Sequence, residues 1–286
     1  MEHLELSHGA LTFDAVADGP DDGAPVLLLH GFPETSHSWR FVQPQLTAAG
    51  LRSVAPDLRG YSPRARPTEA SDFSIELLVG DVIAMADELG WDAFHLVGHD
   101  WGGALAWQTA GRHQHRVRSL AVVSTPHPSA FADAKQAGPG PDGQDQAVMS
   151  SYMDLFRQPG AEDMFLGEGG AGFQLLLEGS GLDAASAAHY ATHFASTEAL
   201  SGALNWYRGA DPFDASGLGP ITMPTLYVWS TDDVAVGRLA AERTARYVEG
   251  PYRFEVLDGT SHWIPEAEPA ALSGFLLGHI ASTAET

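Results

Sequence analysis

The stretch Val97–Gly103, with the sequence VGHDWGG, decides how the rest of this chain is interpreted. It follows an apolar run typical of a buried strand and leads into a segment with helical periodicity. The spacing Gly98-x-Asp100-x-Gly102 is that of a nucleophile elbow with aspartate in the nucleophile position. Asp100 would project at the helix N-terminus, where the dipole and free N–H groups favour its ionised form. The simpler alternative is a glycine-rich turn in which Asp100 only caps the helix.

Short apolar runs alternate with longer helical stretches on both sides of this turn. This alternation predicts an α/β fold with a mostly parallel sheet of eight strands flanked by helices. The apolar runs are continuous, as in strands that are covered on both faces. We predict buried strands over 26–29, 51–55, 93–97, 117–123, 225–229 and 254–257, an opening antiparallel pair over 4–7 and 10–15, and helices over 36–49, 75–89, 103–113, 237–248 and 266–280.

One interval between predicted strands is far longer than the others. It extends from Pro126 to Pro224, whereas a crossover needs only about a dozen residues, and structureless loops of that size are rare in compact domains. It is rich in Gly, Pro and Asp over 132–146 and becomes helical from about Ala147. We therefore expect an inserted helical cap over the carboxyl edge of the sheet, with the core over 1–127, the cap over 128–217 and the rest of the core over 218–286.

Composition limits the classes of protein that fit. Hydrophobic residues make up 44% of the chain, which suits a globular core, and no apolar run approaches the roughly 18 residues that span a bilayer. The N-terminal stretch lacks the pattern of a secretory signal, so we expect a cytoplasmic enzyme. The absence of cysteine excludes disulfides, thiolate metal sites and cysteine nucleophiles.

The charge is strongly acidic, with 15 Lys and Arg against 37 Asp and Glu, which gives a net charge of −22. Such a surface repels nucleic acid and anionic membranes, so we expect neither as a partner. It also mildly disfavours anionic substrates that approach from bulk solvent. The simpler explanation of the charge is that it keeps the protein in solution.

Four motifs occur in an order that identifies a family. They are HGFPE at 30–34, DLRGY at 57–61, GHDWGG at 98–103 and GTSHW at 259–263. Together they resemble the epoxide hydrolase branch of the α/β-hydrolase superfamily, and the resemblance covers essentially the whole chain. It implies the α/β-hydrolase fold and a hydrolase that needs water but no metal or organic cofactor.

The resemblance also implies an oxyanion hole beside Asp100. The backbone N–H groups of Phe32 and Trp101 would point at the same carboxylate oxygen of Asp100, as the fold requires of the loop after the strand 26–29 and of the residue after the nucleophile. In this family the bond before the HGFP proline is often cis, so we expect that of Phe32–Pro33, and Pro33 would line the substrate pocket. His99 points away from the site by strand alternation, so a packing role is expected.

The base and the orienting acid follow from position. His262 comes after the last predicted strand, where an α/β-hydrolase places its catalytic histidine. The segment after the strand 225–229 offers Asp232 and Asp233 as the acid. The family pattern Gly-x-x-Asp, with Ser230 in place of the glycine, selects Asp233, and Asp232 remains the alternative. The resulting order of nucleophile, acid and base is that of the fold.

A carboxylate nucleophile suits attack on saturated carbon. The alkyl ester formed on Asp100 would be hydrolysed by water that His262 activates. Epoxide hydrolases and haloalkane dehalogenases both work in this way, and the leaving group separates them. An epoxide oxygen needs a proton donor, whereas a halide needs N–H donors. A tyrosine hydroxyl, with a pKa of about 10, stays protonated at neutral pH and can donate to the oxygen.

Two tyrosines of the predicted cap match the epoxide hydrolases. The sequence LNWYR around Tyr207 resembles the cap tyrosine motif of that family, and Tyr152, seven residues before Pro159, matches the spacing of the other cap tyrosine. Each alone could be a core aromatic residue, and Tyr190 is the substitute for Tyr152. Trp206 of the same motif is expected to shape the substrate pocket.

The favoured hypothesis is therefore hydrolysis of a small-molecule epoxide to a vicinal diol. Haloalkane or haloacid dehalogenation is the alternative, although Trp101 stands where fluoroacetate-type dehalogenases carry an arginine. A catalytically silent ligand-binding member of the fold and an esterase-like activity complete the alternatives. The choice between a monomer and a homo-oligomer stays open.

Overall fold

Eight strands form a single sheet in the order β1-β2-β4-β3-β5-β6-β7-β8. The computed structural model describes residues 1–283, apart from the side chains at positions 168 and 169. Strands β1, β2 and β4 pair antiparallel, and every pair from β4 through β3 to β8 is parallel. The predicted eight-stranded sheet is confirmed, with strands β1 (Glu2–His8), β2 (Leu11–Asp18), β3 (Ala24–Leu29), β4 (Leu51–Pro56), β5 (Phe94–His99), β6 (Val117–Val123), β7 (Thr225–Asp232) and β8 (Tyr252–Ser261).

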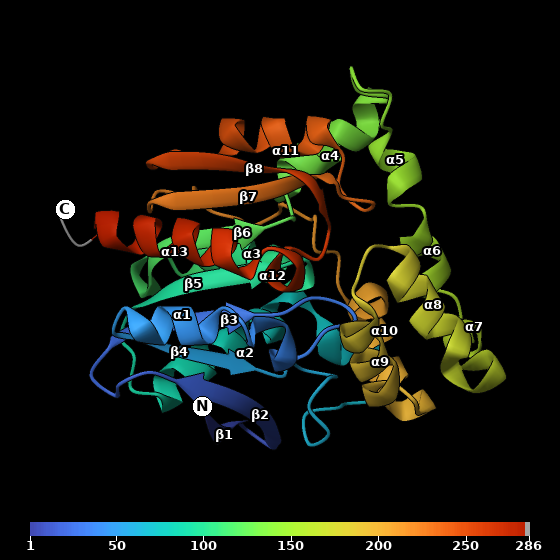
Figure 1. Cartoon of the computed structure of the whole chain (residues 1–286), viewed down its shortest axis with the longest axis horizontal. Coiled ribbons are helices and arrows are strands. Elements are labelled where there is room, and N and C mark those ends of the chain that lie inside the picture. The colour runs from blue at the N-terminus through green and yellow to red at the C-terminus, as the bar shows by residue number, and fades with distance from the viewer. Residues whose placement is uncertain (284–286) are drawn as a thin grey trace.

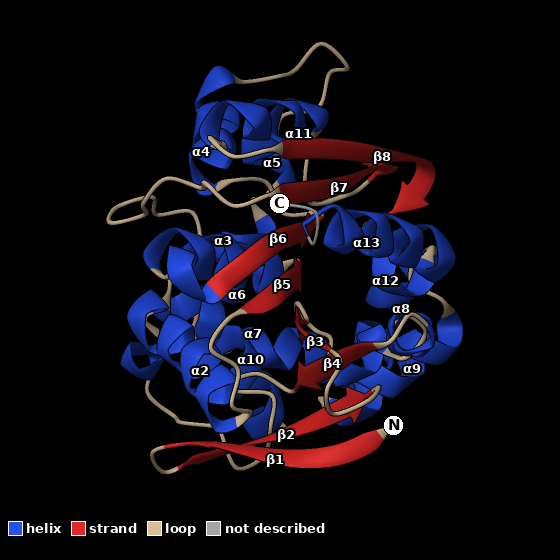
Figure 2. Ribbon diagram, turned by 90° about the vertical axis from the view of Figure 1, so that its left-hand side faces the viewer, coloured by secondary structure: helices blue, strands red, loops and turns tan. Residues whose placement is uncertain are grey.

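Helices cover both faces of the sheet, as Figures 1 and 2 show. Alternate residues of β3 explain why both faces need cover: Leu27 and Leu29 join one apolar cluster, and Val26 and Leu28 join the other. The first cluster lies under α2 (Ile75–Glu88), α3 (Trp101–Arg112) and α11 (Arg238–Arg243), and the second under α1 (Gln43–Ala48) and α13 (Pro269–Thr283).

Three of the predicted helices are divided at prolines or by 3-10 turns, and one of these, 237–248, forms α11 followed by a 3-10 turn. The segment 36–49 forms a 3-10 turn before α1, which has a proline in its first turn, and 266–280 is split into α12 (Ile264–Ala267) and α13, which begins at a proline. Proline fits the first turn because it has no N–H to donate. The 3-10 turns are η1 (Ser36–Trp39), η2 (Ala70–Phe73), η3 (Gln114–Arg116), η4 (Gly167–Gly170) and η5 (Thr244–Tyr247).

The long interval between β6 and β7 forms seven helices. The first, α4, packs against α11, and the others stand beyond the carboxyl ends of the parallel strands (Figure 1). Helix α4 was not predicted, because glycine and proline are frequent from Gly138 onward and helical periodicity is clear only after that point. The helices are α4 (Pro128–Ala137), α5 (Gln146–Met149), α6 (Tyr152–Phe156), α7 (Ala161–Leu166), α8 (Ala171–Gly179), α9 (Ala184–His193) and α10 (Thr197–Gly209).

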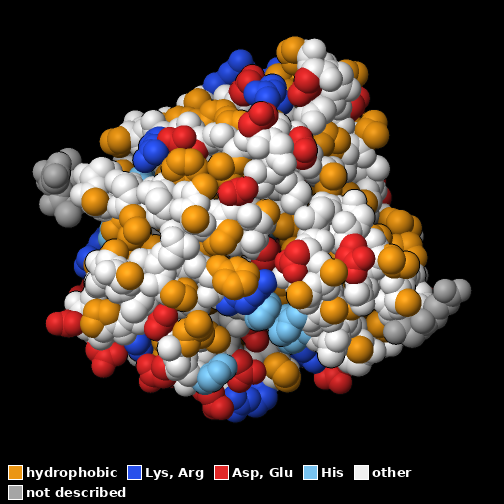
Figure 3. Space-filling view, viewed as in Figure 1, with side chains coloured by type: hydrophobic (Ala, Val, Ile, Leu, Met, Phe, Trp, Pro, Cys, Tyr) orange, Lys and Arg blue, Asp and Glu red, His pale blue; other side chains and the backbone are white. Residues whose placement is uncertain are grey.

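The surface carries scattered charge and a group of exposed apolar side chains. Figure 3 shows acidic side chains spread over one face of the molecule rather than gathered in one place. Several large apolar side chains of the inserted helices are exposed, among them Val148, Leu155, Met164 and Leu176. Over residues 1–283, the structure contains no helix whose length and apolar character would let it cross a bilayer.

Candidate active site

The predicted strand–turn–helix places Asp100 at the sharp turn between β5 and α3. Asp100 has φ 50° and ψ −120°, a backbone conformation that residues other than glycine seldom adopt. The turn is tight because a Cβ atom at Gly98 would lie 2.1 Å from the carbonyl oxygen of Gly102, and a Cβ atom at Gly102 would lie 2.2 Å from that of Leu29. Both glycines are therefore required for the turn that carries the Asp100 side chain into the cavity beneath the inserted helices.

His262 lies between two carboxylates. Its Nε2 atom is 3.5 Å from Oδ2 of Asp100, and its Nδ1 atom is 2.8 Å from Oδ2 of Asp233. The other oxygen of Asp233 accepts the backbone N–H groups of Ala235 and Val236 at 2.8 and 2.9 Å. Since Asp233 is held from two sides, it fixes the imidazole ring with Nε2 facing Asp100.

The structure brings Asp233, and not Asp232, to the histidine. Asp233 is buried, whereas Asp232 is exposed and accepts the hydroxyl of the neighbouring Thr231. Ser230, where the family has glycine, donates its hydroxyl to the carbonyl oxygen of Ser261 at 2.9 Å. Ser230, which departs from the family pattern, therefore links the loop that carries Asp233 to the loop that carries His262.

The negative charges of Asp100 and Asp233 and the positive charge of His262 stabilise one another. Burial alone would raise the pKa of Asp100, but the hydrogen bond and the charge of His262 outweigh it and hold that pKa below its usual range. Burial would likewise lower the pKa of His262, but Asp233 and Asp100 together raise it well above its usual value. At neutral pH the free site therefore holds an ionised Asp100 beside a protonated His262.

The loop after β3 supplies an N–H donor to Asp100. The backbone nitrogen of Phe32 donates to Oδ1 of Asp100 at 2.8 Å. The peptide bond Phe32–Pro33 is cis, as predicted, and both residues line a cavity that also contains Asp100. Trp101 is the first residue of α3, so its N–H lies at the helix N-terminus next to Asp100.

A buried pair, Glu34 and His99, supports this arrangement and was not predicted. Oε2 of Glu34 accepts the N–H of Gly31 at 2.7 Å and pairs with Nδ1 of His99 at 2.9 Å, and Nε2 of His99 pairs with the carbonyl oxygen of His262 at 3.0 Å. His99 thus links the loop beside Asp100 to the loop of His262, which is more than the expected packing role. The only signal in the sequence was an acid within the HGFPE motif.

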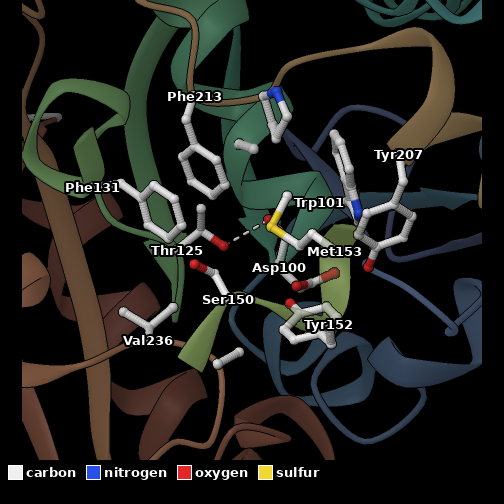
Figure 4. A pocket seen from close by; sticks show the side chains of 13 residues that line it. Asp100, Trp101, Thr125, Phe131, Ser150, Tyr152, Met153, Tyr207, Phe213 and Val236 are labelled. Atoms are coloured by element: carbon white, nitrogen blue, oxygen red, sulfur yellow. Dashed lines mark hydrogen bonds between the residues drawn. The ribbon is translucent and has the colours of Figure 1, made fainter. Parts of the chain in front are cut away.

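Tyr152 and Tyr207 both reach the cavity that contains Asp100. They line it from α6 and α10, and Figure 4 shows their hydroxyl groups turned toward the Asp100 carboxylate. Burial and the charge of Asp100 raise the pKa of each phenol well above its usual value, so both stay protonated. The ring of Trp101 packs edge-on against that of Tyr207, with centroids 5.0 Å apart. The protonated hydroxyl group of Tyr207 can therefore donate to a group bound in the cavity.

Two other candidates lie outside this cavity. The hydroxyl of Tyr190 donates to Oε1 of Glu266 at 2.6 Å, so Tyr190 does not take the place of Tyr152. Trp206 was expected to shape the pocket, but its indole N–H donates to the carbonyl oxygen of Arg59 at 2.6 Å, and it lines neither of the cavities next to Asp100. Trp206 and Tyr207 are neighbours on α10 but face different directions, and of the two only Tyr207 lines the cavity.

The cavity around Asp100 has two parts, and both are mostly apolar. The outer part has a volume of about 240 Å³ and contains His262 and Pro33, and the inner part has a volume of about 30 Å³. Within residues 1–283, no group of three or more histidine and acidic side chains is arranged to hold a metal ion.

Comparisons with known proteins agree with this geometry. Residues 24–162 match the model of the alpha/beta hydrolase fold family. Epoxide hydrolase A of Mycobacterium tuberculosis is 32% identical over 92% of this chain and 94% of its own length, and epoxide hydrolase 3 of Xenopus tropicalis is 31% identical over 93% and 74%. A solved epoxide hydrolase from metagenomes of hot environments superposes with a TM-score of 0.83 at 30% identity, over 98% of each chain.

The fold and the match to the family model define an α/β hydrolase. The relatives, aligned over nearly the whole chain, narrow this class: the chain belongs to the epoxide hydrolase family.

Proposed function

We infer that this protein hydrolyses epoxides to vicinal diols and that Asp100 is the nucleophile. The observation that carries the inference is the position of one ionised carboxylate opposite two protonated tyrosines in a mostly apolar cavity. Such a cavity offers a nucleophile on one side of the epoxide ring and proton donors on the other. The epoxide hydrolases among its relatives support the same activity.

In the first step, a carboxylate oxygen of Asp100 forms a bond to an epoxide carbon, and the electron pair of the broken C–O bond moves to the ring oxygen. That oxygen takes a proton from Tyr207 or Tyr152 and becomes a hydroxyl group. The phenolate left behind is a strong base because its buried phenol has a raised pKa. It therefore regains a proton readily from the imidazolium of His262 through water.

This proton transfer prepares the second step. Formation of the ester removes the charge of Asp100, one of the two carboxylates that raise the pKa of His262. Neutral His262 then takes a proton from water, and the water oxygen attacks the carboxyl carbon of the ester. The N–H groups of Phe32 and Trp101 would stabilise the tetrahedral oxyanion. When the intermediate collapses, the alkyl oxygen leaves with the proton of the added hydroxyl group, and the diol is released.

Dehalogenation is not favoured by the polar groups near Asp100. A halide ion would need N–H donors, and the indoles are the obvious source. The indole N–H of Trp206 is committed to the carbonyl oxygen of Arg59, and Trp101 packs edge-on against Tyr207. The two tyrosine hydroxyl groups beside Asp100 are proton donors that suit an oxygen leaving group.

We propose that the inserted segment 128–217 acts as the cap of this site. Its helices α6 and α10 hold the two tyrosines above Asp100, while α4 contacts the core helix α11. The substrate would therefore bind between the cap and the carboxyl edge of the sheet.

The test is an assay of one aryl epoxide and one bromoalkane, reading diol and bromide release. We expect diol from the epoxide and no bromide, and Asp100→Ala should abolish diol formation. Release of bromide at a comparable rate would favour the dehalogenase.

A further inference from the structure

Asp100 lies where two cavities of very different volume meet. The outer cavity of about 240 Å³ and the inner chamber of about 30 Å³ share Asp100, Tyr152, Tyr207 and Ala235. If an epoxide ring lies between the carboxylate and the tyrosines, its substituents must be divided between the two spaces. Each of the two cavities therefore limits the size of the substituent that it receives.

The inner chamber ends at a pair of stacked aromatic rings. Phe131 of α4 and Phe213 of the segment after α10 stack with centroids 3.5 Å apart and an interplanar angle of 8°. Figure 4 shows this pair on the side of the chamber away from Tyr207, with Asp100 between. Since a water molecule needs roughly 10–15 Å³ when the space is measured in this way, the chamber holds about two, or a substituent of one or two carbon atoms.

The two hydroxyl groups that line the inner chamber but not the outer cavity, those of Ser150 and Thr125, already have hydrogen-bond acceptors. Ser150 donates its hydroxyl to the carbonyl oxygen of Gln146 at 2.6 Å, and Thr125 donates to that of Asp100 at 2.7 Å. A polar substituent would thus find few hydrogen-bond donors there, and desolvation would disfavour it. The chamber suits hydrogen or a small apolar group.

The outer cavity differs from the inner chamber in size and access, because it is wide and opens to solvent. Leu155, Met164, Leu176 and Val234 line it and are between 47% and 55% exposed, so they form an apolar mouth. No lysine or arginine lines this cavity among the described residues. It suits a long alkyl or aryl substituent without charge.

We propose that the enzyme selects uncharged epoxides with one large apolar substituent and, on the other side of the ring, nothing larger than ethyl. Phe131 and Phe213 set this limit as specificity-determining residues. The proposal rests on the proposed epoxide hydrolysis and specifies its substrate class.

A third cavity shows why the limit depends on these two rings. It has a volume of about 240 Å³, and Phe131 and Phe213 line it as well as the inner chamber. Charged side chains border it, including Lys135, Asp154 and Arg157. Truncation of either ring would join the inner chamber to this space and make room for a larger second substituent.

Two isomers of equal composition test the proposal. In 1,2-epoxydecane one carbon of the ring carries only hydrogen, whereas cis-5,6-epoxydecane has a butyl group on each side. We expect kcat/KM of the wild-type protein to be at least about 100-fold higher for the terminal isomer. In Phe213→Ala and in Phe131→Ala this ratio should fall at least about tenfold.

Phe254→Ala is the matched control, because Phe254 stacks on Tyr227 in the sheet and lines none of the three cavities. It should leave the ratio unchanged. If the alanine variants do not fold, the same ratio of kcat/KM is measured in Phe213→Leu, which is a smaller change. Similar rates for both isomers in the wild type, or an unchanged ratio in both ring variants, would overturn the proposal. If the wild-type protein hydrolysed neither of the two isomers nor the aryl epoxide, the proposed function itself would be overturned.

Discussion

Gly31 and Asp100 approach so closely that no side chain fits between them. A Cβ atom at Gly31 would lie 2.3 Å from Cβ and 2.5 Å from Oδ1 of Asp100. This approach allows the next residue, Phe32, to direct its N–H at Oδ1, although the two residues are 68 positions apart in the chain. The loop after β3 and the Asp100 side chain are therefore positioned by each other.

Gly31→Ala should therefore damage catalysis more than stability. The added methyl group must displace either Asp100 or the loop, and loss of one oxyanion donor typically lowers kcat by about 10²–10³. We expect a fall of that size in diol formation. Gly274→Ala in α13, where a Cβ atom meets nothing within 4 Å, is the control and should keep full activity. Near-normal activity of Gly31→Ala would contradict the assigned oxyanion loop.

His262→Gln should arrest the reaction after the first step. Glutamine cannot take a proton from water, so the ester on Asp100 should accumulate. Mass spectrometry should then find the peptide containing Asp100 heavier by the mass of the substrate. The double variant with Asp100→Asn should carry no adduct. A variant that loses activity without forming the adduct would argue against the covalent route.

Replacement of the cavity tyrosines should impair ring opening. Tyr207→Phe or Tyr152→Phe removes one proton donor and should lower kcat, and the double variant should lose about 10²–10⁴ in rate because no general acid remains. Stopped-flow measurement of ester formation would locate the defect in the first step. Tyr190→Phe is the control, since its hydroxyl contacts Glu266 outside the cavity. A double variant near the wild-type rate would refute the assignment of both residues.

The pairing of His262 also predicts how stability depends on pH. Its pKa is raised well above 6.5 in the folded protein, so its contribution to stability is complete below pH 6.5 and is lost as the pH rises through the folded-state pKa. The melting temperature of the wild type should therefore fall more between pH 7 and pH 10 than that of His262→Gln, by about 2–4 °C. Parallel curves would contradict the raised pKa.

Most of the fold could be predicted because its signals are local. The strand Val117–Val123 was predicted at its observed bounds, since a continuous apolar run defines a strand that is buried on both faces. Helix α4 was missed because the glycines and prolines that follow it, from Gly138 onward, obscured its periodicity. The bounds of the proposed cap likewise depend on which helix packs against which, and such contacts leave no pattern in one sequence.

Within the site, only the residues that belong to sequence motifs could be predicted. Asp100 and His262 stand at positions that the order of strands defines. Side-chain direction is different: Trp206 and Tyr207 are neighbours in one motif, yet only Tyr207 faces the cavity. The stack of Phe131 on Phe213 joins segments that are distant in sequence and carry no motif, so packing alone reveals it.

The insertion between β6 and β7 also bears on how this enzyme can evolve. Asp100, Asp233 and His262 all lie outside it, while both tyrosines and most of the side chains that limit substrate size lie within it. Substitutions within this one contiguous stretch of the chain can thus change which epoxides the enzyme accepts. The segments that carry Asp100, Asp233 and His262 would be inherited unchanged.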